Sequence, residues 1–215
     1  ILRVATPDVV VVTRLPDIPV HVEAYASPGA VREEEFSPAY ALPAGAPLIV
    51  SSDDPYALEN ALRMPARVIS YGLAESASVR LRDIAFYEKS GAVSGMKARA
   101  EMSGAQGELT VKGSVGKTQL LPAAAALAVA LAFDIPSAEA LIALEAYEPP
   151  PGRGRLLAGG NGSVIIDDSY NASPAAVEEA LATLKAFPRA KRRVAVLGDM
   201  LELGRYSVME HERIA

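Results

Sequence analysis

The spacing of apolar and polar residues along the chain predicts two kinds of strand and several helices. Residues 8–13 contain a continuous β-branched run, typical of a strand buried on both faces. Residues 48–50 and 67–71 are predicted as two more strands. A helix is expected after the first run, where Ser27 can cap it and Pro28 suits its first turn. Another helix is expected over about 55–63.

The pattern changes between residues 79 and 111. Apolar and polar residues alternate at 79–84 and 108–111, and do so weakly at 97–100. Such alternation favours an antiparallel section with one solvated face. An Ala-rich helix is then predicted over about 120–133, and a further helix starts at Ser137, directly after Pro136.

A proline cluster marks the best domain boundary. The segment 148–154 contains three consecutive prolines, which remove hydrogen-bond donors and fix φ, so it cannot be a helix or a central strand. Beyond it the pattern predicts a strand at 163–166, a helix at 174–187 and a strand at 193–197. Strand, crossover helix and strand would form a right-handed parallel unit. We therefore expect an α/β protein with domains at residues 1–151 and 152–215.

Composition narrows the class of function. The chain has 215 residues, half of them apolar, and a formal net charge of −5, without a block of Lys or Arg. These values argue against binding to nucleic acid. The absence of cysteine excludes disulfides and thiolate metal sites. The longest apolar stretch, 120–133, falls short of the roughly 20 residues that a membrane span needs.

Two polar loops are candidates for chemistry, because ligands gather at the carboxyl ends of parallel strands. They are 167–174, with the sequence DDSYNASP, and 198–204, with the sequence GDMLELG. The adjacent Asp167 and Asp168 suggest a metal or ribose site. The alternative is an Asx turn with Ser173 capping the next helix.

These two loops, in this order and spacing, closely resemble the C-terminal domain of the D-alanyl-D-alanine-adding Mur ligases. The resemblance extends over nearly the whole chain, through short segments that match the family's pattern. These are Thr6-Pro7-Asp8, residues 21–25, residues 51–55, Gly152-Arg153 and His211-Glu212. The resemblance implies the remainder of a central ATPase-like domain, with a mixed sheet and helices, followed by the start of a Rossmann-like domain.

The same resemblance implies a function. Members of this family use ATP and Mg²⁺ to phosphorylate the terminal carboxylate of UDP-N-acetylmuramoyl-tripeptide. The amine of D-alanyl-D-alanine then attacks the acyl phosphate. By the resemblance we expect a cytoplasmic, monomeric enzyme with small-molecule substrates and no nucleic-acid partner.

Site residues are carried over position by position. Arg153 would reach the phosphates from the interdomain hinge, Asp168 would hold the ribose or orient the nucleotide, and Tyr170 and Asn171 would line it. Ser51 and Asp53 belong to a segment that contacts the nucleotide in the family. His21 would be a Mg²⁺ ligand, a role open to neutral imidazole. The alternatives are a solvated linker charge for Arg153 and a capping or core role for His21.

Two positions depart from the family pattern. Glu35 stands where the family has a carbamylated lysine that bridges toward magnesium, and Ser51 stands where it has asparagine. One hypothesis is that the Glu35 carboxylate replaces the carbamate as a catalytic and metal-binding group. The other is that Glu35 belongs to a solvated acidic helix face.

The segment 113–118, GSVGKT, looks like a phosphate-binding loop before a helix. By the family's register, however, the phosphate loop lies upstream of residue 1, and this segment is a helix N-terminus near the cleft. We therefore expect a fragment that is inactive alone. The alternatives are another amino-acid ligase of the Mur superfamily and a non-catalytic nucleotide-binding relative.

Overall fold

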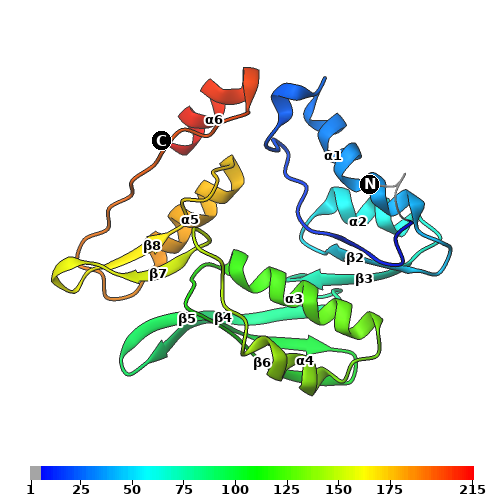
Figure 1. Ribbon diagram of the computed structural model, residues 1–215, viewed down its shortest axis with the longest axis horizontal. Helices are drawn as coiled ribbons and strands as arrows, with labels where there is room; N and C mark the ends of the chain where they lie inside the picture. Colours follow the sequence, from blue (N-terminus) through cyan, green and yellow to red (C-terminus); the bar gives the residue numbers. More distant parts are fainter. Residues whose placement is uncertain (1–5) are drawn as a thin grey trace.

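The computed structural model describes residues 6–215, which form a mixed sheet, a small antiparallel sheet and helices packed around them (Figure 1). The strands are β1 (Val10–Val12), β2 (Pro47–Ser51), β3 (Arg67–Gly72), β4 (Val79–Lys89), β5 (Ala92–Met102), β6 (Ala105–Lys112), β7 (Arg155–Ala158) and β8 (Val164–Asp167). The α-helices are α1 (Pro28–Phe36), α2 (Pro55–Leu62), α3 (Lys117–Ala132), α4 (Ser137–Leu144), α5 (Pro174–Ala186) and α6 (Ser207–Ile214). Short 3₁₀ turns are η1 (Val22–Ala24), η2 (Ser37–Ala41), η3 (Gly160–Gly162) and η4 (Gly204–Tyr206).

The large sheet follows the order of the sequence, β1 to β6. Strands β1 to β4 are parallel neighbours, whereas β4, β5 and β6 are antiparallel. The antiparallel section predicted between residues 79 and 111 is therefore confirmed, and so is the α/β class with a mixed sheet. Short turns suffice to connect antiparallel strands, while the parallel strands β2 and β3 are joined by helix α2.

Two hydrophobic cores lie on opposite faces of the parallel strands. Strand β2 alternates between them: Leu48 and Val50 face the core under α1 and α2, and Ile49 faces the core under α3. All three side chains are fully buried. This explains the uninterrupted apolar run, because a strand covered by helices on both sides has no polar face.

Strand β1 differs from the prediction. It is shorter than the run 8–13 and pairs only with β2, so it is an edge strand of the described sheet. Val12 is buried in the second core, but Val11 is 40% exposed. The prediction of burial on both faces is therefore wrong for this strand, because within residues 6–215 the side chain of Val11 packs into neither hydrophobic core.

Helix α3 begins earlier than predicted, at Lys117, and contains Pro122. Gly116 precedes it with a φ of 110°, a conformation that side chains rarely adopt. The many alanines let the helix lie close against β3 to β6, and Ala123, Ala124 and Ala128 are buried there. None of the helices within residues 6–215 combines the length and the apolar character that a bilayer crossing demands.

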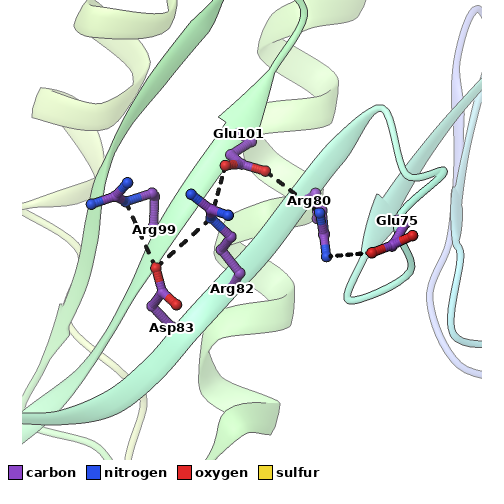
Figure 2. Close-up of polar contacts among 6 residues, drawn as sticks. All are labelled: Glu75, Arg80, Arg82, Asp83, Arg99 and Glu101. Atoms are coloured by element: carbon purple, nitrogen blue, oxygen red, sulfur yellow. Dashed lines mark hydrogen bonds and ion pairs between the residues drawn. The ribbon is translucent and has the colours of Figure 1, made fainter.

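The outer face of the antiparallel section is charged. Arg82 Nε lies 2.8 Å from Glu101 and 3.8 Å from Asp83, which also lies 3.8 Å from Arg99. Arg80 connects Glu101 to Glu75, and Figure 2 shows the resulting row of alternating charges. The polar positions of the alternating pattern are thus the solvated face of β4 and β5.

The last part of the chain departs from the predicted parallel unit. Strand β8 pairs antiparallel with β7, a strand that the sequence pattern did not predict. Helix α5 forms as expected, with Ser173 as its cap, but residues 193–197 are not a strand. Val196 is 92% exposed there, because within the described residues no strand lies beside it to complete a hydrogen-bonded ladder. The predicted right-handed parallel unit is therefore wrong for this chain.

Candidate functional site

The segment after the proline cluster brings three of the predicted site residues together. The guanidinium carbon of Arg153 lies 4.3 Å from the centre of the Tyr170 ring, a cation–π contact. The backbone N–H of Tyr170 donates to the carbonyl of Gly152 at 3.2 Å. Tyr170 is 71% exposed, so its ring and the arginine form an open surface beside residues 152–154, the proposed hinge.

The two adjacent aspartates, Asp167 and Asp168, accept hydrogen bonds from the backbone of this segment. Asp168 accepts a hydrogen bond from the N–H of Gly154 at 2.9 Å, and Asp167 accepts one from Gly152 at 3.2 Å. Asp167 also accepts from the hydroxyl and the N–H of Ser169, which forms an Asx turn, the alternative that the sequence left open beside a metal or ribose site. The hinge and the 167–170 loop are therefore one hydrogen-bonded unit.

The folded structure shifts the pKa values of the two carboxyls in opposite directions. The hydroxyl of Ser169 is the main cause that lowers the pKa of Asp167 below its ordinary value. Desolvation by the surrounding loop raises the pKa of Asp168, although the residue stays exposed by area, and the Gly154 N–H and the charge of Arg153 oppose this effect. Relative to a free aspartate, the loop thus favours the charged form of Asp167 and disfavours that of Asp168.

The hinge is also attached to the segment that resembles a phosphate loop. The buried hydroxyl of Ser114 donates to the carbonyl of Arg153 at 2.7 Å, and the N–H of Val115 donates to Gly154 at 2.9 Å. Gly154 has a φ of 64°, and a Cβ there would lie 2.6 Å from the Val115 carbonyl. Only glycine fits this close approach. Sequence reasoning did not identify Ser114 as part of the site.

Lys117, the lysine of the same segment, does not point to an open phosphate site. Its ammonium lies 2.8 Å from the carboxylate of Glu179 on α5. The pair joins the first turn of α3 to the helix that follows the 167–173 loop. This contact favours a connecting role for residues 113–118 over phosphate binding.

His21 and Glu202 form a second group. His21 is exposed and has a φ of 65°. Glu35 is not in hydrogen-bond or ion-pair contact with His21 among the described residues; burial raises the pKa of Glu35, and the charge of His21 lowers it in part. Nδ1 of His21 contacts the carboxylate of Glu202, in the GDMLELG loop. The backbone carbonyl of Glu202 also accepts a hydrogen bond from the N–H of Glu23 at 3.4 Å.

The donors of this group can be compared with those that Mg²⁺ uses. Within residues 6–215, no three His, Asp, Glu or Cys side chains converge as a ready-made metal site. Mg²⁺ in nucleotide enzymes is usually bound through one or two carboxylates and completes its shell with phosphates and water. A carboxylate on one ring nitrogen of a histidine is the usual partner of a metal on the other. With Glu202 on Nδ1, Nε2 of His21 is the nitrogen that remains for a cation.

The segment after β2 forms a third, separate group. Ser51 is buried, and its hydroxyl accepts from the N–H of Asp53 at 3.3 Å. The Asp53 carboxylate accepts from the N–H of Leu73 at 2.9 Å, and Asp54 caps α2 through Ala57. The side chains here mainly shape the loop at the carboxyl end of β2.

The remaining predicted residues are placed without shared contacts. Asn171 is exposed, and its side-chain oxygen accepts the N–H of Ala172 at 2.8 Å. The structure thus groups Arg153, Asp168 and Tyr170, and separately His21 and Glu202. Among the described residues, no hydrogen bond or ion pair joins these two groups to Glu35, Ser51, Asp53 or Asn171. Glu202 is not among the predicted site residues, because its partner His21 is distant along the chain.

His211 forms a hydrogen bond to the backbone of the GDMLELG loop. Its Nε2 accepts the N–H of Met200 at 3.0 Å, and its Nδ1 lies 2.8 Å from the carbonyl of Ser207. This pattern requires the proton on Nδ1 and an acceptor at Nε2. His211 therefore supports the loop that carries Glu202, rather than lying free on the helix surface.

Comparisons with known proteins find relatives of this chain among the Mur ligases. Residues 152–215 match the family model described as Mur ligase, glutamate ligase domain. The UDP-N-acetylmuramoyl-tripeptide--D-alanyl-D-alanine ligase of Mycobacterium bovis is 30% identical over 200 residues, which are 90% of this chain and 38% of that protein. The UDP-N-acetylmuramate--L-alanine ligase of an Arthrobacter species is 32% identical over 185 residues, 84% of this chain and 37% of that protein.

A solved structure extends the likeness to the fold. The crystal structure of MurF ligase from Thermotoga maritima in complex with ADP has a TM-score of 0.85 and 26% identity, over 99% of this chain and 46% of that one. The chain thus spans less than half the length of these relatives. On its sequence motifs, its fold and these matches, the chain is similar to the D-alanyl-D-alanine-adding ligases of the Mur ligase family, whose family model matches residues 152–215.

Proposed function

We propose that the protein carrying this chain is an ATP-dependent ligase that joins D-alanyl-D-alanine to UDP-N-acetylmuramoyl-tripeptide in peptidoglycan precursor synthesis. The grouping of Arg153, Tyr170 and Asp168 at the hinge carries this proposal. Arg153 is suited to binding phosphate, and the 167–174 loop places an exposed tyrosine ring and a carboxylate beside it. The related MurF structure from T. maritima is a complex with ADP.

The reaction would proceed in two steps. The terminal carboxylate of the tripeptide attacks the γ-phosphorus of ATP, and ADP leaves, which gives an acyl phosphate. The amine of the dipeptide attacks the carbonyl carbon, loses a proton, and inorganic phosphate leaves as the amide forms. Both steps concentrate negative charge, so cationic groups and the exclusion of water accelerate them.

The residues of the chain would divide this work. Arg153, held by Tyr170, would place its guanidinium on the phosphates, while Asp168 would orient the nucleotide against the hinge and Tyr170 and Asn171 would line it. His21 and Glu35 would hold Mg²⁺, which when bound supplies positive charge beside the phosphate oxygens. In this proposal the Glu35 carboxylate takes the place of the carbamylated lysine of the family. Ser51 and Asp53 would shape the nucleotide side of the cleft.

The test uses the full-length protein that contains these residues. We expect release of phosphate from ATP only when both UDP-N-acetylmuramoyl-tripeptide and D-alanyl-D-alanine are present. Arg153→Lys keeps the charge but loses the planar fork and its stacking, so it should raise KM for ATP. The matched control is Arg192→Gln, an exposed residue outside both groups.

Three other outcomes would each mean something different. Turnover with UDP-N-acetylmuramate and L-alanine instead would assign the protein to another ligase of the superfamily. ATP binding without turnover on any acceptor would identify a non-catalytic relative. Unchanged Mg²⁺-dependent turnover of Glu35→Gln would remove Glu35 from the metal site. Residues 1–215 by themselves are expected to show no turnover.

A further inference from the structure

A small hollow lies between two segments that are far apart in the sequence. One segment runs from Val22 to Ser27, around η1, and the other runs from Leu203 to Tyr206, around η4. The hollow measures about 240 Å³. Sites for drug-sized ligands usually measure about 300–1,000 Å³, so this one suits a ligand as small as an amino acid or dipeptide.

Two opposite charges line this hollow. Glu23 comes from the first segment and Arg205 from the second. The Arg205 guanidinium donates to the hydroxyl of Tyr206 at 2.9 Å and lies 5.0 Å from the centre of that ring. Within the described part of the chain, neither Glu23 nor Arg205 has an ion-pair partner.

The charged face of β4 to β6 provides a useful contrast. It also has a hollow, of about 420 Å³, lined by Asp83, Lys97, Arg99 and Glu108 among others. These charges are already paired, Lys97 with Glu108 at 3.5 Å and Arg99 with Asp83 at 3.8 Å. A ligand would have to break those pairs. In the smaller hollow both charges are available to a ligand that carries one charge of each sign.

The approach of the two segments depends on one glycine. A Cβ on Gly204 would lie 2.8 Å from the Cβ of Glu23, and the φ of Gly204 is 51°. The N–H of Glu23 also donates to the Glu202 carbonyl at 3.4 Å. The hollow therefore adjoins the His21–Glu202 contact directly, because Val22 follows His21 and Leu203 follows Glu202.

We infer that this hollow binds the zwitterionic amine substrate, with its carboxylate on Arg205 and its ammonium group on Glu23 before attack. This inference rests on the proposed function and deepens it, since it names where the second substrate lies. The position agrees with the chemistry: the amine must reach the carbonyl carbon of the acyl phosphate, whose phosphate group would lie beside the cation that His21 would hold. Apolar atoms of Val22, Ala26 and Leu203 would face the methyl groups of the ligand.

The test changes the ligand and the protein together. Binding to the full-length protein is measured by calorimetry for D-alanyl-D-alanine, for its C-terminal amide and for its N-acetyl form. For the wild type, loss of either charge on the ligand should weaken binding about tenfold or more, since hydrogen bonds to charged groups contribute that much. This arm needs no variant, so a folding defect cannot obscure it.

Two protein variants then identify which side chain binds which charged group of the ligand. Arg205→Gln should weaken binding of the dipeptide but leave binding of its C-terminal amide unchanged. Glu23→Gln should weaken binding of the dipeptide but leave binding of its N-acetyl form unchanged. Arg192→Gln is the matched control. If both variants bind all three ligands as the wild type does, or if the wild type does not distinguish the three ligands, the inference is overturned.

This inference and the proposed function fail in different ways. Ligation with unchanged KM for D-alanyl-D-alanine in both variants would leave the ligase in place and remove the hollow from its mechanism. Charge-dependent binding of an L-amino acid, without binding of D-alanyl-D-alanine, would keep the hollow as an amine-substrate site and remove the proposed substrate.

Discussion

Nδ1 of His21, next to η1, contacts the carboxylate of Glu202, in the loop before η4. Both residues have positive φ, 65° and 63°, so each is held in a conformation that side chains seldom adopt. The pair joins the segment with the proposed metal ligand to the C-terminal loop that is typical of the family. It thereby makes one group out of two regions that the sequence presents separately.

Removal of the Glu202 charge should impair the proposed metal site while leaving the fold intact. In Glu202→Gln the partner that orients His21 is weaker, and losses of such partners cost about 10–100-fold in metal affinity or activity. The apparent affinity for Mg²⁺ can be measured by titration of phosphate release, and the thermal midpoint checks folding. Glu212→Gln, an exposed change on α6, is the control. Equal Mg²⁺ dependence in both variants would reduce the His21–Glu202 contact to a structural one.

The hinge glycine Gly154 should not tolerate a side chain. Gly154→Ala adds a Cβ 2.6 Å from the Val115 carbonyl at a φ of 64°, so we expect a loss of at least about 1 kcal/mol in the free energy of unfolding. Gly160→Ala, where a Cβ would meet nothing within 4 Å, should change it by less than about 0.5 kcal/mol. Urea unfolding of both variants compares them directly. Similar stabilities would show that the backbone around Ser114 adapts easily.

The ion pair between Lys117 and Glu179 should couple α3 to α5. The two atoms are 2.8 Å apart, and the Glu179 side chain is only 19% exposed. Lys117→Glu and Glu179→Lys should each destabilise, and the double reversal should recover part of the loss, with a coupling of up to about 1 kcal/mol. A double-mutant cycle in urea measures this value. Purely additive effects would mean that the two helices are held by apolar contacts alone.

The stability of the chain should fall in acid partly through Asp167. Because the folded state lowers the pKa of Asp167 below its ordinary value of 3.8, the charged form stabilises the fold above that pH. The contribution disappears as the pH falls from about 3.8 through the lower folded-state pKa. Asp167→Asn should therefore differ from the wild type in free energy of unfolding at pH 6 and converge with it at the acid end. A constant difference across this range would rule out the carboxylate as the cause.

Several local elements could be predicted from the sequence because their causes are local. Ser27 and Ser173 cap α1 and α5 as expected, since a cap needs only a hydroxyl three residues before an N–H. The alternation in β4 to β6 was recognised because one face is solvated along the whole section. Burial of Val11 and a strand at 193–197 were predicted wrongly, since both depend on neighbours that the local pattern does not contain.

The motifs of the sequence by themselves determined the family resemblance, the α/β class and the loops at which chemistry is expected, because residue type and spacing are written directly in the chain. Only the tertiary structure decided that β8 pairs with β7, that Lys117 meets Glu179 and that Glu202 meets His21. Contacts of this kind are set by how distant surfaces pack together. Their energies arise from proximity in space, which no window of neighbouring residues encodes.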